Sequence, residues 1–279
     1  MDFYIGTGTK NNFLEISEEE FQAIKTNKEI LMATLNFEGR YEIFVKNYID
    51  FEKEILIQSI PLLLSGSWKD HDDLFEEITL FDVKISNLLS SARLYRDHIL
   101  KDSGSLFDLE INNLFSHEFD TSQEFRFMEK FRNYVQHKGL PVSRITKRVK
   151  SEGDKRKHII DIYCSKKNLD FNPKYIDELE DQINLKKSIR HYMSSVSSIH
   201  VKIRGLIRDK FTASTSMLKK QIEEYRTKSN NHNFIQAHSP VESVDLSIVK
   251  DIEKTILKKQ KINRELIKLE SRVISNEIV

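Results

Sequence analysis

The stretch Phe131–Val142 reads FRNYVQHKGLPV, and it marks the point where the chain changes from helix to strand. Gly139 can adopt the left-handed conformation that closes a helix, and Pro141 prevents the helix from continuing. Two runs rich in β-branched residues follow, VSRITKRVK and KRKHIIDIYC, joined by the turn-forming sequence SEGD. We therefore expect a helix over about 123–138 and then a β-hairpin over about 142–164.

The rest of the chain has a helical pattern. Only 8 glycines and 4 prolines occur in 279 residues, which is little turn chemistry for an all-β fold. Amphipathic segments with a period near 3.6 residues predict helices at about 17–28, 37–64, 72–101, 184–228 and 246–274. The sequence thus predicts a mainly α fold, a helical bundle with a small β-hairpin insertion, as a single domain over 1–279.

Local signals refine these boundaries. Ser17 and Glu20 form a capping-box pattern, and Pro61 predicts a kink or an end in the second helix. Residues 102–122 are interpreted as a polar connector and 229–243 as a polar loop. After the hairpin, helices are expected to resume at about Pro173.

Composition excludes several classes of protein. The formal net charge of +1 gives no global field that would attract nucleic acid, so charge must be considered locally. The single cysteine, Cys164, fits a reducing cytoplasm better than a disulfide framework. The N-terminus lacks a signal-peptide pattern, and the longest apolar run, ILIQSIPLLL, is far shorter than the ~20 residues of a spanning helix. We expect a cytoplasmic protein without membrane contact.

The sequence contains no HExxH or CxxC pattern and no P-loop, GxGxxG or GxSxG motif. Its histidines are scattered. We therefore expect neither a metal site nor a cofactor, and the usual nucleotide-hydrolase, dinucleotide-binding and α/β-hydrolase functions are not indicated.

The helix over 123–138 separates apolar from polar residues. On a helical wheel its apolar arc contains Phe127, Met128, Phe131, Tyr134 and Val135, and Arg132, Asn133 and His137 all lie outside that arc. Asn133 and His137 are four residues apart and can touch, whereas Arg132 and His137 diverge by about 140°. Either the last turn unwinds or a second copy of the helix completes a site that uses both side chains.

The sequence Arg132-Asn133-Tyr134-Val135-Gln136-His137 resembles the R-X4-6-H motif of HEPN domains, in which a polar residue usually follows the arginine. The preceding SHEFDTSQEFRFMEK is also similar to stretches of bacterial HEPN-like proteins, and the resemblance covers about 70–140. It implies a HEPN-like core over about 37–228 and a homodimer formed along the motif helices.

The resemblance further implies a metal-independent endoribonuclease of a toxin-antitoxin or antiviral defence system, with RNA as substrate and an antitoxin or defence protein as a possible partner. The implied catalytic residues are Arg132 and His137, with Asn133 in support. Metal-free RNA cleavage needs a base, an acid and a cation for the developing charge, and a two-fold axis would supply two histidines and two arginines. The alternatives are a non-catalytic HEPN-like interaction or nucleotide-binding module, or a solvated helix face with a capping histidine.

The predicted hairpin carries a local excess of positive charge, with seven basic residues against two acidic ones between 144 and 157. Placed just after the motif, these side chains could hold an RNA backbone, and the candidates are Lys138, Arg144, Lys147 and Arg148. A solvated hairpin edge that lysines protect from aggregation explains the same pattern.

Overall fold

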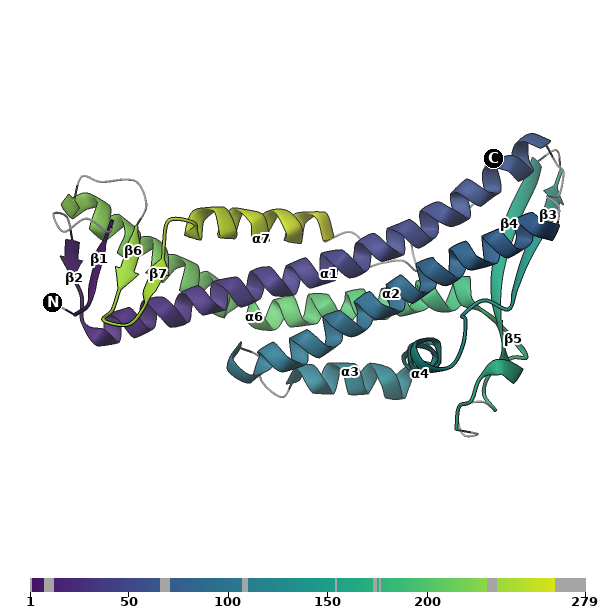
Figure 1. Cartoon of the computed structure of the whole chain (residues 1–279), viewed down its shortest axis with the longest axis horizontal. Helices are drawn as coiled ribbons and strands as arrows, with labels where there is room; N and C mark the ends of the chain where they lie inside the picture. Colours follow the sequence, from purple (N-terminus) through teal and green to yellow (C-terminus); the bar gives the residue numbers. More distant parts are fainter. Residues whose placement is uncertain are drawn as a thin grey trace. The chain divides into compact units, whose positions relative to one another are not determined.

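The computed structural model describes residues 2–7, 13–65, 71–106, 110–153, 155–172, 175, 177–229 and 235–263, and these are mainly helical, as the sequence predicts (Figure 1). The helices are α1 (Glu18–Ser65), α2 (His71–Leu106), α3 (Glu110–Thr121), α4 (Gln123–His137), α6 (Leu185–Ser229) and α7 (Val249–Asn263). The strands are β1 (Tyr4–Gly6), β2 (Phe13–Glu15), β3 (Arg144–Glu152), β4 (Lys155–Ser165), β5 (Gln182–Asn184), β6 (Gln236–His238) and β7 (Ser243–Asp245), and a 3-10 turn, η1, spans Lys166–Asn168.

Backbone contacts group the chain into two compact units. The first contains the described residues up to Gly39, 101–106 and 202–263, and the second contains those of 40–100 and 110–201. Helices α1, α2 and α6 contribute residues to both. The single domain over 1–279 stays a prediction.

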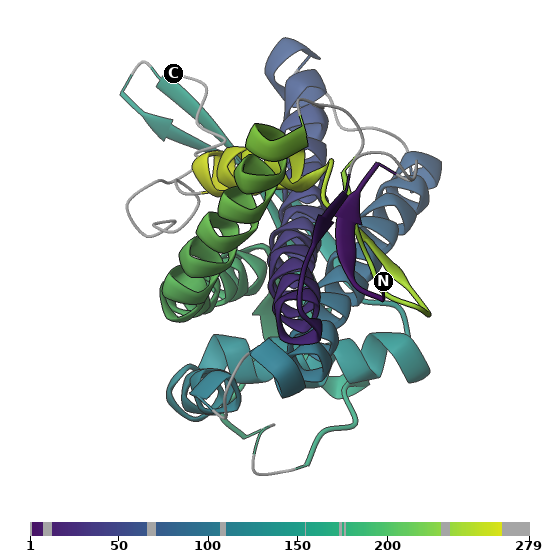
Figure 2. The ribbon, with the colours of Figure 1, turned by 90° about the vertical axis from the view of Figure 1, so that its left-hand side faces the viewer.

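The first unit contains a four-stranded antiparallel sheet in the order β2-β1-β6-β7 (Figure 2). Ile5 and Ala237 are fully buried and belong to a core that also includes Phe21 of α1, Tyr225 of α6 and Ile256 of α7. The prediction of a polar loop over 229–243 is therefore wrong for 236–238. Strands of three residues are too short to show an alternating pattern, and β1 pairs with a strand more than two hundred residues away.

Helix α1 is longer than predicted, because it runs without a break from Glu18 to Ser65 and contains Pro61. The capping box is present, since the Glu20 N–H donates to Ser17 Oγ at 3.1 Å and the Ser17 N–H to Glu20 Oε2 at 2.8 Å. The expected break between 28 and 37 is wrong. Its polar residue Thr34 donates instead to the Ile30 carbonyl at 2.8 Å and remains helical.

Other predicted boundaries also change. Helix α2 reaches Leu106 and α3 occupies most of the expected connector over 102–122, with Ile111 and Phe115 buried. The helix expected over 184–228 is confirmed as α6, whereas the helix expected to resume at about Pro173 falls largely on residues outside the described part of the chain. Residues 264–274 of the expected last helix lie outside the described chain.

The second unit contains the predicted hairpin. Strands β3 and β4 pair in antiparallel register from Arg144↔Tyr163 to Glu152↔Lys155, and β5 pairs with β4 on its other side. Gly153 has a φ of 63° at the turn, a conformation that favours glycine. The sequence missed β5 because it is only three residues long.

The end of α4 differs from the prediction in one respect. The Lys138 N–H donates to the Tyr134 carbonyl at 2.8 Å, but Gly153 is the glycine with a positive φ in the described chain, so Gly139 does not close the helix in a left-handed conformation. Glycine is required at 139 because a Cβ there would overlap the Tyr134 hydroxyl and lie 2.8 Å from its Cζ. The chain then turns, and the Val142 N–H donates to Asp82 of α2 at 2.7 Å.

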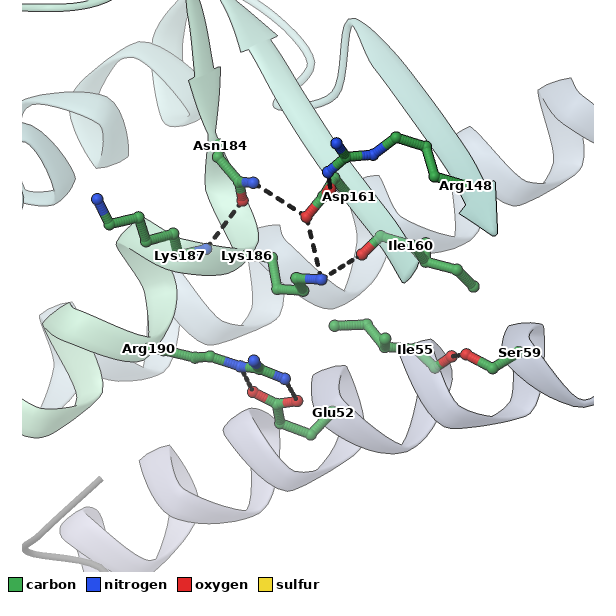
Figure 3. Close-up of polar contacts among 10 residues, drawn as sticks. All are labelled: Glu52, Ile55, Ser59, Arg148, Ile160, Asp161, Asn184, Lys186, Lys187 and Arg190. Atoms are coloured by element: carbon green, nitrogen blue, oxygen red, sulfur yellow. Dashed lines mark hydrogen bonds and ion pairs between the residues drawn. The ribbon is translucent and has the colours of Figure 1, made fainter. Parts of the chain in front are cut away.

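Two separate groups of ionic contacts, each with a buried carboxylate, connect elements of the second unit (Figure 3). Glu52 of α1 accepts two hydrogen bonds from the Arg190 guanidinium of α6, both at 2.7 Å. Asp161 of β4 contacts the Lys186 ammonium at 3.1 Å, accepts from Asn184 Nδ2 at 3.0 Å and forms an ion pair with Arg148. The Glu52–Arg190 pair therefore joins α1 to α6, and the Asp161 network joins the hairpin, β5 and the start of α6.

We expect Gly139→Ala to lower the free energy of unfolding by about 1–3 kcal/mol, because the Tyr134 ring must move to admit the methyl group. Urea denaturation would measure the change. The matched control is Gly39→Ala within α1, where the added Cβ has nothing within 4 Å and should raise stability by about 0.4–1 kcal/mol. Equal effects of the two substitutions would contradict the steric account.

Acid should weaken the network through Asp161. Burial alone raises the pKa of this carboxyl, but hydrogen bonds from Arg148 and Asn184 and the charge of Lys186 lower its pKa overall. A lowered folded-state pKa contributes stability above the unfolded value, about 3.9, that is lost as pH falls through the folded value. Urea denaturation between pH 7 and 2 should therefore show a smaller acid loss for Asp161→Asn than for the wild type, whereas exposed Asp50→Asn should match the wild type.

Candidate functional site at the end of helix α4

Helix α4 packs its apolar face into the second unit. Phe127, Met128 and Phe131 are buried as predicted, and Tyr134 and Val135 are half-buried. The rings of Phe127 and Phe131 are stacked with centroids 5.1 Å apart. Ser122 caps the helix by accepting the Phe125 N–H at 3.2 Å.

Arg132 is not on the solvated face that the helical wheel suggests, because only 6% of the residue is exposed. Its Nη2 donates to Asn133 Oδ1 at 2.7 Å, and its Nη1 lies 3.7 Å from Glu129 Oε2. Glu129 is one turn earlier and equally buried, so it supplies the opposite charge that a buried guanidinium needs. Glu129 lies three residues before Arg132, a spacing that makes the two side chains neighbours on the helix, but a helical wheel does not show that both are buried.

Glu129 is the centre of a buried polar cluster. It accepts a hydrogen bond from Tyr192 Oη at 2.6 Å and forms an ion pair with Arg96 of α2 as well as with Arg132. Burial, and then the Glu129 charge, raise the pKa of Tyr192 well above its usual value, so the phenol keeps the proton that it donates. The Glu129 carboxylate thus forms ion pairs with two guanidinium groups.

Arg132 has unused donors. Its Nε and Nη1 atoms are buried and have no hydrogen-bond partner among the described residues. An arginine offers five N–H donors, and buried donors without acceptors are costly. An anionic ligand or a further protein group could satisfy them.

A pocket of about 270 Å³ lies at the C-terminal end of α4. Its α4 wall contains Lys130, Asn133, Tyr134, His137 and Lys138, and the opposite wall comes from the segment after η1, with Asp170, Phe171, Asn172 and Tyr175. Asn133 and His137 are exposed, in agreement with the wheel. The structure therefore brings Asn133, His137 and Lys138 together, whereas Arg132 does not line this pocket and is linked to it through Asn133.

Sequence reasoning missed five of the lining residues, namely Lys130, Asp170, Phe171, Asn172 and Tyr175. Lys130 shares a helix face with Asn133 and His137, three and seven residues later, and this spacing could have indicated it. The Lys130 Nζ lies 4.8 Å from the Tyr175 ring centre, and Lys138 forms an ion pair with Asp170. No local pattern connects Asp170, Phe171 or Tyr175 with a helix that ends more than thirty residues earlier.

The basic residues of the hairpin have intramolecular partners. Lys147 lies 2.6 Å from Glu77 and only 12% of its side chain is exposed, Arg148 pairs with Asp161, and the Arg144 guanidinium lies 5.9 Å from the Tyr163 ring centre. None of these three lines the α4 pocket. The side chains of residues 155–157 lie outside the described part of the chain.

Within the described ranges, no group of three or more His, Cys, Asp or Glu side chains is arranged to hold a metal ion. Cys164 is buried, and burial followed by the charge of Asp82 raises the pKa of its thiol to about 12. A thiol with that pKa stays protonated at neutral pH and is a poor nucleophile.

Comparisons of the chain with family models, with curated proteins and with solved structures found no match. The resemblance to HEPN domains therefore stays a prediction. No helix in the described chain is both long enough and apolar enough to cross a membrane.

The cluster around Glu129 predicts a large stability effect. Glu129→Gln removes the charge that two buried or half-buried guanidinium groups share, and we expect it to lower the free energy of unfolding by about 3–5 kcal/mol. Tyr192→Phe, which removes one hydrogen bond to the same carboxylate, should cost about 1.5–3 kcal/mol. Urea denaturation measures the free energy of unfolding of both variants and of the control, the exposed Glu76→Gln. Equal free energies of unfolding for all three would contradict this account.

Proposed function

We propose that this protein is a metal-independent endoribonuclease, a toxin or antiviral defence effector that acts in the cytoplasm on RNA as a homodimer. The observation that supports the proposal most directly is the link through Asn133. Asn133 accepts a hydrogen bond from Arg132, whose Nε and Nη1 have no hydrogen-bond acceptor among the described residues, and lines the same basic pocket as His137.

The chemistry uses groups that this chain supplies. In the proposed reaction the RNA 2′-hydroxyl attacks the adjacent phosphorus, the new P–O2′ bond forms and the P–O5′ bond breaks. A base removes the 2′ proton, an acid gives a proton to the departing 5′ oxygen, and cations stabilise the charge on the phosphoryl oxygens. The products are a 2′,3′-cyclic phosphate and a 5′-hydroxyl.

His137 is the candidate for proton transfer, because it is exposed at the pocket and sits at the end of α4. Arg132 and Lys138 are the candidate cations. One chain offers a single histidine at this pocket, so base and acid require a second copy of α4 across a two-fold axis.

A second candidate function is a non-catalytic module that binds a nucleotide or a partner protein. It is favoured by the burial of Arg132, which contacts Glu129 and Asn133 and does not line the pocket. In this function the pocket would bind its ligand through Lys130, Asn133 and His137 without cleaving it.

A cleavage assay in EDTA separates the two functions. Wild-type protein should cut single-stranded RNA and leave 2′,3′-cyclic phosphate ends, and His137→Ala should slow cleavage about 10²- to 10⁴-fold with an unchanged melting temperature. The matched control is His117→Ala, an exposed histidine on α3. Intact RNA under all conditions, or His137→Ala with wild-type activity, would contradict the nuclease function, and ligand binding without cleavage would support the binding module.

A further inference from the structure

The α4 pocket has two unlike walls. One carries the polar and basic side chains Lys130, Asn133 and His137 of α4 and Lys138 of its C-cap, beside Tyr134. The other presents two aromatic rings, Phe171 and Tyr175, from the segment that follows η1. A volume of about 270 Å³ lies just below the ~300–1,000 Å³ that small-molecule sites span, so the pocket suits one small ligand rather than a long one.

Neighbouring side chains hold both aromatic rings. The Phe171 ring packs against Phe127 of α4 with centroids 6.3 Å apart, and Phe171 remains half-buried. The Tyr175 ring meets Phe119 edge to face at 6.4 Å and lies beneath the Lys130 ammonium. Rings that are fixed before binding lose little entropy when a flat ligand stacks on them.

The charged rim of the pocket contains an exchangeable contact. Lys138 forms an ion pair with Asp170, and 53% and 74% of the two side chains are exposed. Hydrogen bonding to Lys138 lowers the pKa of Asp170, which therefore stays ionised at neutral pH. Exposed ion pairs are weak, so a phosphate group can replace the carboxylate on Lys138.

We propose that the α4 pocket binds one unpaired nucleotide of single-stranded RNA, with its base against Phe171 and Tyr175 and its phosphate on Lys138 in place of Asp170. The proposal rests on the nuclease function above and names its substrate class. Single-stranded RNA is required because bases inside a duplex are stacked on each other and cannot reach an aromatic wall. Both rings come from outside the stretch that resembles the HEPN motif.

The test is binding of the full chain, in EDTA, to a fluorescent RNA strand that is 2′-O-methylated at every position and so lacks the attacking hydroxyl. Phe171→Leu keeps the apolar volume but removes the aromatic face, and it should weaken binding about 5- to 150-fold by anisotropy. The matched control is Phe75→Leu, a phenylalanine that is 71% exposed on α2, and it should bind like the wild type. Asp170→Asn should bind about two- to five-fold tighter.

A double-mutant cycle tests the base contact itself. A set of RNA strands carries one abasic nucleotide each, at a different position in each strand. The wild type should bind one of these strands as weakly as Phe171→Leu binds the intact strand, and Phe171→Leu should bind that abasic strand no more weakly than the intact one. This arm does not depend on how well the variant folds, because the loss on the abasic strand is measured with the wild type. Annealing the complementary strand should also weaken binding.

Equal affinities of Phe171→Leu and Phe75→Leu, or a duplex that binds as tightly as the single strand, would overturn the proposal. The two proposals fail separately. RNA binding that depends on Phe171 and on a single strand, without cleavage of unmodified RNA, would contradict the nuclease function alone. Cleavage by a protein whose RNA affinity is independent of Phe171 would contradict the base site alone.

Discussion

Buried carboxylates that meet buried or half-buried guanidinium groups are the interaction on which this structure depends. In the first unit Glu38 of α1 is fully buried and accepts two hydrogen bonds from Arg204 of α6, both at 2.8 Å. In the second unit Glu52 and Arg190 repeat the arrangement between the same two helices. Removing one partner would leave a buried charge without compensation, so these pairs specify which helix faces meet more than they add net stability.

The spacing of these pairs shows how the long helices are specified. Positions 38 and 52 are fourteen residues apart on α1, and 190 and 204 are fourteen apart on α6. Fourteen residues are close to four full turns, so each helix presents both of its charged groups on nearly the same face. The apolar pattern around them supplies most of the driving force, and the charges exclude alternative registers.

The same constraint shapes the candidate site. Glu129 is buried on α4, and it recruits Arg96 and Arg132 and accepts the Tyr192 hydroxyl proton. Arg132 is consequently withdrawn from solvent while Asn133 and His137 remain at the pocket. The Nε and Nη1 atoms of Arg132 have no hydrogen-bond acceptor among the residues that the structure describes.

The sequence by itself determined the helical class, the hairpin, the extent of α6 and the apolar face of α4, because each depends on the periodicity of neighbouring residues or on a turn signal beside it. It also placed Asn133 and His137 on an exposed face. Only the tertiary structure decided that Arg132 is buried, that three-residue strands pair across the chain, and that Asp170, Phe171 and Tyr175 close a pocket over α4. These features depend on partners distant in sequence, and no local pattern encodes the partner that a side chain will meet.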